Sequence, residues 1–218
     1  RMDFFPLWLS LKVSVTATIL TVATGLPLAW VLALKRFPGR DVAEVVVVLP
    51  LVLPPTVLGY YLLVLISRQG AIGRVLDAAG IELAFTWRAA VLAAWVGSSA
   101  LFIKAAQAGF ESVDRRLEQA AFTLGRSQWS VFWSVTLPLA SRAVMAGTVL
   151  AFCRALGDFG ITLMVAGSIP GLTQTTPLAI YDLVQSNRMA EANTLSLIAV
   201  ATVALLLMGI GRLARLRF

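Results

Sequence analysis

Residues 117–139 read LEQAAFTLGRSQWSVFWSVTLPL, a moderately polar stretch that is rich in small residues and lies between long apolar runs. Within it, Gln119-Ala120-Ala121 is followed after three residues by Gly125, and Val135-Thr136-Leu137-Pro138 follows after nine more. The apolar runs on both sides are long enough to cross a bilayer, which takes about 20 apolar residues as a helix. The stretch is therefore expected to connect two membrane spans outside the hydrocarbon core.

The same stretch carries signals for two short helices with a bend between them. Ser112 can cap a helix that runs to Leu124, and Gly125 can end that helix in a left-handed turn. Ser127 can cap a second short helix, and Pro138 suits the first turn of the span that follows. Such a bent pair could dock on a partner protein, or it could lie on the membrane surface as an amphipathic hairpin with no partner.

The composition is that of a membrane protein. Of the 218 residues, 59% are hydrophobic and 13% are charged, against about 25% charged in soluble domains. The net charge of +7 does not come from a basic patch, because Lys and Arg lie at the ends of apolar runs, so no nucleic acid partner is expected. The length predicts a single domain over residues 1–218.

The sequence offers little for catalysis. It has no histidine, no G-x-x-x-x-G-K-[ST] phosphate loop, and no nucleophile with an evident base. We therefore expect no catalytic residue, no metal site and no cofactor on this chain. Its one cysteine, Cys153, lies in an apolar run and is expected to be a small buried residue.

Five apolar runs qualify as membrane spans, which predicts an all-α, multi-pass helical bundle in a membrane. They cover residues 13–34, 45–67, 89–109, 143–166 and 192–211. The third run requires that Lys104 extend to the membrane surface. Residues 161–181 are uncharged but hold prolines and a polar cluster, so they are expected to form an outer or re-entrant loop, with a sixth crossing as the alternative.

The basic residues predict how the bundle is oriented. One side of the membrane would hold Lys35, Arg36, Arg40, Lys104, Arg115, Arg116, Arg126, Arg142, Arg212, Arg215 and Arg217, and the other Arg1, Lys12, Arg68, Arg74, Arg88 and Arg188. The richer side should be cytoplasmic. This places the N-terminus outside, and it places the C-terminus and residues 117–139 in the cytoplasm.

Three prolines interrupt the second apolar run. Pro50, Pro54 and Pro55 each remove a helical hydrogen bond, and the carbonyls they free could line a pathway or form a hinge. A simple packing kink between helices is an equal alternative.

An ionic pair is predicted inside the fourth run. Arg154 and Asp158 are four residues apart, so they share a helical face, and nearby Gly157 and Gly160 permit close helix contact. The pair could simply neutralise itself, or Arg154 could attract an anion near a gate. The polar loop at 167–177 could meet a delivery protein outside, or it could be a solvated connector.

The spacing from Gln119 through Gly125 to Leu137-Pro138 resembles the cytoplasmic EAA loop of ABC importer permeases. Residues 49–60, 85–92, 154–160 and 168–171 are similar to the permease subunit of bacterial molybdate- or tungstate-type ABC importers. Gln119 stands where the loop usually has glutamate, although Glu118 precedes it. Val135 stands where isoleucine is common.

The resemblance implies a homodimer in the inner membrane, with a pathway for an oxyanion on its two-fold axis. It implies two ATPase subunits that carry ATP and Mg²⁺, and a periplasmic oxyanion-binding protein. The segment 112–137 would be the coupling segment. The residues implied in ATPase coupling are Glu118, Gln119, Ala120, Ala121, Gly125, Ser127, Leu137 and Pro138. The alternatives are a sulfate-type permease and a motor-free carrier or channel.

Overall fold

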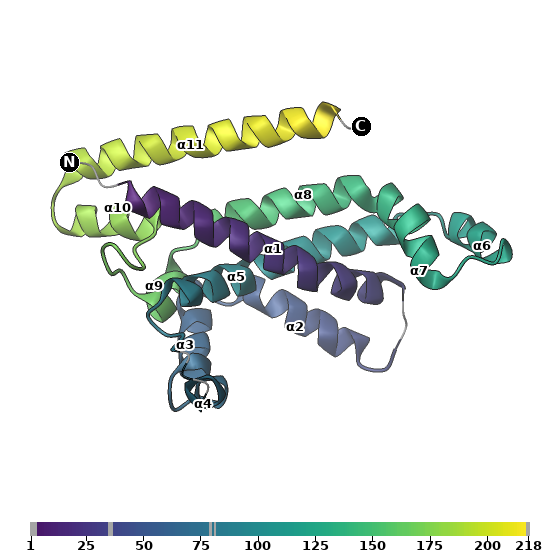
Figure 1. The fold of residues 1–218 in the computed structure, drawn as a ribbon, viewed down its shortest axis with the longest axis horizontal. Coiled ribbons are helices and arrows are strands. Elements are labelled where there is room, and N and C mark those ends of the chain that lie inside the picture. Colours follow the sequence, from purple (N-terminus) through teal and green to yellow (C-terminus); the bar gives the residue numbers. More distant parts are fainter. Residues whose placement is uncertain (1–3, 35–36, 79, 81, 217–218) are drawn as a thin grey trace.

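The computed structural model describes residues 4–34, 37–78, 80 and 82–216, and within these residues the regular structure is helical (Figure 1). The helices are α1 (Phe5–Leu34), α2 (Arg40–Val52), α3 (Pro55–Ile66), α4 (Ala71–Ala78), α5 (Trp87–Glu111), α6 (Arg115–Thr123), α7 (Gln128–Val131), the π-helical turn η1 (Phe132–Thr136), α8 (Leu137–Leu156), α9 (Gly160–Ala166), α10 (Thr176–Gln185) and α11 (Met189–Leu216). Arg1, Lys35, Arg36 and Arg217, four of the cations used to predict orientation, lie outside the described residues.

Four continuous helices are long and apolar enough to cross a membrane. They are Phe5–Leu34, Trp87–Glu111, Gln128–Leu156 and Met189–Gly209. The bent pair α2 and α3 passes the same test when it is counted as one span, with an angle of 113° between its halves. The all-α membrane fold with five spans is therefore confirmed, but the second span is broken rather than continuous.

The break between α2 and α3 has a local cause. Pro54 and Pro55 are consecutive residues without an N–H, so the carbonyls of Pro50 and Leu51 receive no hydrogen bond from the next turn. Leu53 is extended (φ −67°, ψ 142°), and Pro55 begins α3 at a position that proline favours. Pro50 itself lies inside α2, so it does not make the bend.

The expected span at 143–166 is divided, because α8 ends at Leu156 and α9 starts afresh at Gly160. Asp158 accepts hydrogen bonds from both the backbone N–H and the hydroxyl of Thr162 (3.0 and 2.7 Å), which begins α9 instead of continuing α8. The 7 residues of α9 and the 10 of α10 are each too short to cross, so residues 161–181 form the expected loop region rather than a sixth spanning helix.

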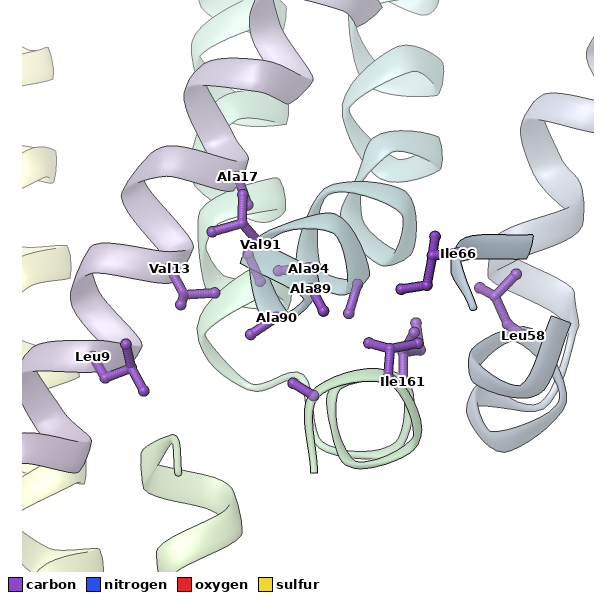
Figure 2. Packing of buried hydrophobic residues seen from close by; sticks show 14 residues of the cluster. Leu9, Val13, Ala17, Leu58, Ile66, Ala89, Ala90, Val91, Ala94 and Ile161 are labelled. Atoms are coloured by element: carbon purple, nitrogen blue, oxygen red, sulfur yellow. The ribbon is translucent and has the colours of Figure 1, made fainter. Parts of the chain in front are cut away.

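The core is built from closely approaching helices, with α1, α5 and α8 side by side (Figure 1). Figure 2 shows one apolar cluster, in which Val13 of α1 points toward α5 and Ala17 of α1 lies beside Val91 of α5. In the same cluster, Ile161 of α9 lies near Leu58 of α3 (Figure 2). Many of the buried side chains are alanines, which let backbones approach closely and gain dispersion contacts that lipid cannot supply.

The last helix stands apart from this bundle (Figure 1). Only 11% of the apolar window of α11 is buried, against 61% for α5. Between α11 and the helices α1, α8 and α10 lies an apolar cavity of about 860 Å³, which Cys153 lines. Cys153 is half-buried, so the expectation that it is a buried residue is only partly met.

Candidate coupling segment and pathway residues

The first helix of the coupling segment begins later than expected. Asp114 caps α6 by accepting a hydrogen bond from the backbone N–H of Arg116 (2.9 Å). The expected cap, Ser112, is instead the residue that ends α5, and its hydroxyl donates to the carbonyl of Gly109 (2.7 Å). Serine and aspartate both favour the position just before a helix. Because α5 extends to Glu111, Ser112 lies at the C-terminal end of α5, and Asp114 is left to cap α6.

The bend after α6 is the expected left-handed glycine turn. Gly125 has φ +77°, and its N–H donates to the carbonyl of Phe122 (2.9 Å) while the N–H of Arg126 donates to that of Ala121 (3.2 Å). These two bonds form a Schellman motif, which satisfies the last carbonyls of the helix. No atom lies within 4 Å of where a Cβ would stand, so the dihedral alone favours glycine there.

After the bend, the chain enters the next span without interruption. Ser127 caps α7, as expected, by accepting a hydrogen bond from the N–H of Ser130 (3.3 Å). The π-helical turn η1 then leads into α8, in which Pro138 lies in the first turn. In a regular α-helix the Pro138 ring would clash with the carbonyl of Ser134, and the wider π turn removes this conflict.

One carboxylate of the motif faces inward rather than outward. Glu118 is only 8% exposed, and its Oε1 accepts a hydrogen bond from the hydroxyl of Thr136 (2.6 Å), which is 1% exposed. This bond joins α6 to the turn that begins α8. Gln119, at the usual glutamate position of the motif, and Ala120 are exposed, while Ala121 is half-buried.

The tip of the bend is apolar and uncovered. Leu124 is 84% exposed, and Leu117 and Phe122 are exposed as well. Apolar side chains gathered on a segment outside the spans are typical of a protein-binding surface. Gly125 and Arg126 lie beside this tip and are also exposed.

An aromatic cluster attaches the coupling segment to the bundle. The ring of Phe132 is buried, and its centroid lies 5.0 Å from that of Trp30 in α1 and 5.9 Å from that of Phe110 in α5. Trp129 completes the contact with its ring 5.7 Å from Trp30. Since such pairs contribute about 0.5–1.5 kcal/mol each beyond the burial of their area, the start of α8 is firmly held.

The structure brings several pathway candidates together. A Cβ on Gly160 would lie 2.8 Å from the Cβ of Pro55, so α9 crosses α3 at the bend itself. Gly59, one turn further along α3, packs in the same way against Met164 of α9. Pro50 is the candidate that lies away from this crossing, within α2.

The predicted pair of Arg154 and Asp158 is present. Arg154 Nη1 donates to Asp158 Oδ1 at 3.0 Å, although Asp158 lies beyond the end of α8 rather than inside a helix. The Asp158 side chain is 2% exposed, whereas that of Arg154 is 29% exposed. With two more bonds from Thr162, the carboxylate is fully engaged, and it holds the guanidinium in a fixed position.

The loop between α9 and α10 is ordered by its own hydrogen bonds. Gly167 and Gly171 have positive φ, and the Thr173 hydroxyl donates to the carbonyl of Gly167 while accepting from the N–H of Ile169 (both 3.1 Å). The N–H of Thr176 donates to the hydroxyl of Ser10 in α1 (2.8 Å). The end of the loop, where α10 begins, is therefore attached to the first helix.

One group of polar residues was missed by the sequence reasoning. It joins α2 to α5 and consists of Arg40, Glu44, Lys104, Gln107 and Glu111. Lys104 was expected only to extend to the membrane surface, but its Nζ is paired with Glu44 (3.4 Å). The spacing of 104, 107 and 111 along one helical face is a signal that could have indicated the group. Within the described residues, no cluster of His, Cys, Asp or Glu could hold a metal ion.

The sequence of this helical membrane protein matches a known family over most of its length. Residues 25–216 match the model of the binding-protein-dependent transport system inner membrane component. The chain therefore belongs to this family of membrane permeases, which confirms the resemblance to ABC importer permeases.

Its relatives include the molybdenum transport system permease protein ModB of Escherichia coli K12, 50% identical over 82% of this chain and 78% of the relative. ModB of Haemophilus influenzae is 44% identical over 85% of this chain and 81% of its own length. A probable sulfate transport permease of Chlorokybus atmophyticus is 32% identical over 92% of this chain and 70% of its own.

A solved structure has the same fold. The bacterial ABC transporter involved in import of the polysaccharide alginate superposes with a TM-score of 0.76, covering 95% of this chain and 78% of that chain. The sequences are 15% identical, so this likeness concerns the fold.

Proposed function

We propose that this chain is the transmembrane permease subunit of an ABC importer for molybdate or tungstate. The observation that carries the proposal is the exposed bend at Gly125, with the apolar tip of Leu124 beside it and Glu118 holding the helix behind it. This uncovered bend at residues 124–126, which we call the elbow, lies outside the spans and is suited to docking on an ATPase subunit. The oxyanion is inferred from the ModB relatives, which are more similar to this chain than the sulfate relative is.

In this proposal the whole chain, residues 1–218, is one permease domain, and 112–137 is its coupling segment. Two copies form the pathway on a two-fold axis, since symmetric pairs are the commonest oligomers. Two ATPase subunits carry the ATP and Mg²⁺ and contact Gln119, Ala120, Ala121, Gly125 and Ser127. The permease itself catalyses no reaction.

We place Glu118, Leu137 and Pro138 in a supporting role. Glu118 is buried against Thr136 and so fixes the helix that the ATPase would push. Leu137 and Pro138 begin the span that would receive this movement.

Arg154 is the proposed anion contact in the pathway. Its guanidinium is partly exposed and uses one nitrogen for Asp158, so the other nitrogens remain able to donate to a passing oxyanion. The carboxylate of Asp158 weakens the attraction of Arg154 for an anion, which suits passage of the anion rather than tight binding. The bend at Pro54 and Pro55 would be the moving part of the gate, and the close crossing of α9 with α3 at Gly160 would be its fixed base.

The orientation follows the distribution of charge, with the N-terminus outside and the C-terminus in the cytoplasm of a bacterial or archaeal cell. The loop at 167–177 then faces the oxyanion-binding protein. α1 begins at the same end of the bundle as α10, and α6 and α7 lie at the opposite end (Figure 1). The loop before α10 and the coupling segment therefore lie at opposite ends of the bundle. An importer needs this arrangement, because its binding protein and its ATPase are on opposite sides of the membrane.

A motor-free carrier fits the described residues less well. A proton-coupled carrier needs a titratable group in the membrane that changes its proton during transport. Asp158 is the candidate, but it accepts three hydrogen bonds and is almost fully buried. These bonds give the carboxylate a structural role, which is to hold Arg154 and Thr162 in place.

The test is ATP hydrolysis by the reconstituted complex. The chain is placed in lipid vesicles with its ATPase, and binding protein loaded with molybdate, tungstate or sulfate is added. We expect the molybdate- or tungstate-loaded form to stimulate hydrolysis and the sulfate-loaded form not to. Stimulation by sulfate alone would make this a sulfate-type permease, and a failure of the ATPase to associate would remove the importer proposal.

A further inference from the structure

Five polar side chains form one connected group between α2 and α5, which we call the α2–α5 polar cluster. Glu44 lies at its centre and accepts from Arg40 Nε (3.1 Å), Lys104 Nζ (3.4 Å) and Gln107 Nε2 (3.3 Å). Gln107 Oε1 accepts from Lys104 Nζ (3.1 Å), and its Nε2 also donates to Glu111 Oε1 (3.0 Å). Arg40 Nη2 closes the circuit to Glu111 at 3.5 Å.

The cluster is balanced in charge and centred on a buried amide. Two cations and two carboxylates are 29–44% exposed, while Gln107 is only 5% exposed. Exposed ion pairs alone contribute little to stability. A buried amide bonded at both ends to charged groups is different, because removing a partner leaves it unsatisfied.

The cluster carries much of the attachment of α2 to the bundle. α2 has no buried residue at all, and its apolar contact with the core is limited to half-buried side chains such as Ala43 and Val47. By contrast, α3 is fixed independently, through the close contacts of Gly59 and Gly160 at its crossing with α9. α2 therefore lies between a polar attachment at one end and the 113° bend at the other.

The position of the cluster along α5 connects it to the coupling segment. Glu111 is the last residue of α5, and Asp114 begins the cap of α6 three residues later. A displacement of α6 thus reaches α5 through a very short connection. The cluster is where α5 can pass that displacement to α2.

We propose that the α2–α5 polar cluster transmits movement of the coupling segment to α2, with the break at Leu53 and Pro54 as the hinge. This inference rests on the proposed function. Lys104, Glu44 and Gln107 are positioning residues that act through α2, and they do not contact the ATPase or the anion. α3 stays with α9 while α2 follows α5, so the angle between α2 and α3 changes during the cycle.

The first measurement is uptake per ATP hydrolysed in the reconstituted complex. Lys104→Met and Gln107→Leu break the cluster with side chains of similar volume. Lys104→Arg retains the charge and the donors, and Asp41→Asn is the matched control because Asp41 is an exposed carboxylate on α2 outside the cluster. We expect Lys104→Met and Gln107→Leu to lower uptake per ATP by roughly tenfold, a typical size for coupling between sites, with Lys104→Arg and Asp41→Asn near wild type.

The second measurement is structural and does not depend on uptake. Spin labels at Val46→Cys in α2 and Tyr61→Cys in α3, both exposed positions, report the hinge in a Cys153→Ala background. We expect the label distance to shift when the ATPase binds ATP, and Lys104→Met to abolish the shift.

The two measurements distinguish a failure of the cluster inference from a failure of the proposed function. If the wild-type complex gives neither stimulated hydrolysis nor uptake, the proposed function fails and the inference with it. If the wild-type complex works, and Lys104→Met and Gln107→Leu match it in uptake per ATP and in the label shift, the function stands and the cluster inference is overturned.

Discussion

A single dihedral decides which residue can stand at position 125. Gly125 has φ +77°, and the space around it is open, so any cost of a side chain there comes from the backbone rather than from neighbours. For an L-residue the left-handed region costs about 1–2 kcal/mol, and asparagine tolerates it best. β-branched residues tolerate it least.

We expect Gly125→Asn to keep stimulated ATP hydrolysis close to wild type and Gly125→Val to reduce it several-fold, because valine resists the turn that shapes the elbow. Stimulated hydrolysis in vesicles measures the effect. Thermal unfolding of the permease is the control and should be the same in both variants, since the elbow lies outside the spans. Equal stimulation by the two variants would contradict the role given to the turn.

The buried bond between Glu118 and Thr136 yields a second expectation at this scale. Glu118→Ala leaves the Thr136 hydroxyl without its acceptor at a cost of about 1–3 kcal/mol, whereas Glu118→Gln retains an acceptor oxygen. We expect trypsin to cut at the exposed Arg126 faster in Glu118→Ala than in Glu118→Gln. Thr136→Val should behave like the alanine variant, and unchanged cleavage in both would show that the bond does not hold the helix.

Sequence reasoning succeeded where a rule is local. Gly125, Ser127 and Pro138 each obey a rule about their own position in a helix, and each lies where expected. The inward direction of Glu118 could not be predicted, because it depends on how α6 packs against a turn 18 residues later.

Among the elements, α3 and α9 cross with little room between them. The contact rests on Gly160, where even a methyl group would lie 2.8 Å from Pro55. Gly157, three residues earlier, has only the carbonyl of Cys153 nearby, at 3.5 Å from its ideal Cβ. The two glycines thus form a matched pair on one segment.

We expect Gly160→Ala to destabilise the permease by about 1–3 kcal/mol, the usual cost of overpacking, and Gly157→Ala to leave it nearly unchanged. Thermal unfolding in detergent compares the two variants directly. Equal midpoints would show that α3 and α9 can separate without cost. In that case they would not form a fixed base for the hinge.

Hydropathy predicted the elements well but not their interruptions. The break after Leu156 lies inside a run whose only charged residues are Arg154 and Asp158, so its cause is a carboxylate bonded to Thr162 rather than a change in composition. Likewise, Pro50, Pro54 and Pro55 all looked capable of bending the second span. Only the consecutive pair did so, because it removes two donors in succession.

For the whole molecule, the orientation in the membrane is the expectation most open to test. With Cys153 replaced by alanine, a single cysteine can be placed at Leu124 on the elbow or at Leu172 on the loop before α10, both exposed. We expect an impermeant maleimide to label Leu172→Cys in intact cells, and Leu124→Cys only after the membrane is opened. The reverse pattern would invert the topology and exclude a cytoplasmic coupling segment.

The charged groups between the helices come in balanced sets. Arg154 faces Asp158, and the two cations of the α2–α5 polar cluster face two carboxylates. One unit charge carried through 100 mV changes the free energy by about 2.3 kcal/mol, so an unbalanced gate would feel the membrane voltage strongly. Displacing these neutral sets would carry no net charge through the membrane voltage. In the proposed importer, the electrical work then falls on the anion alone, which enters a negative cell interior.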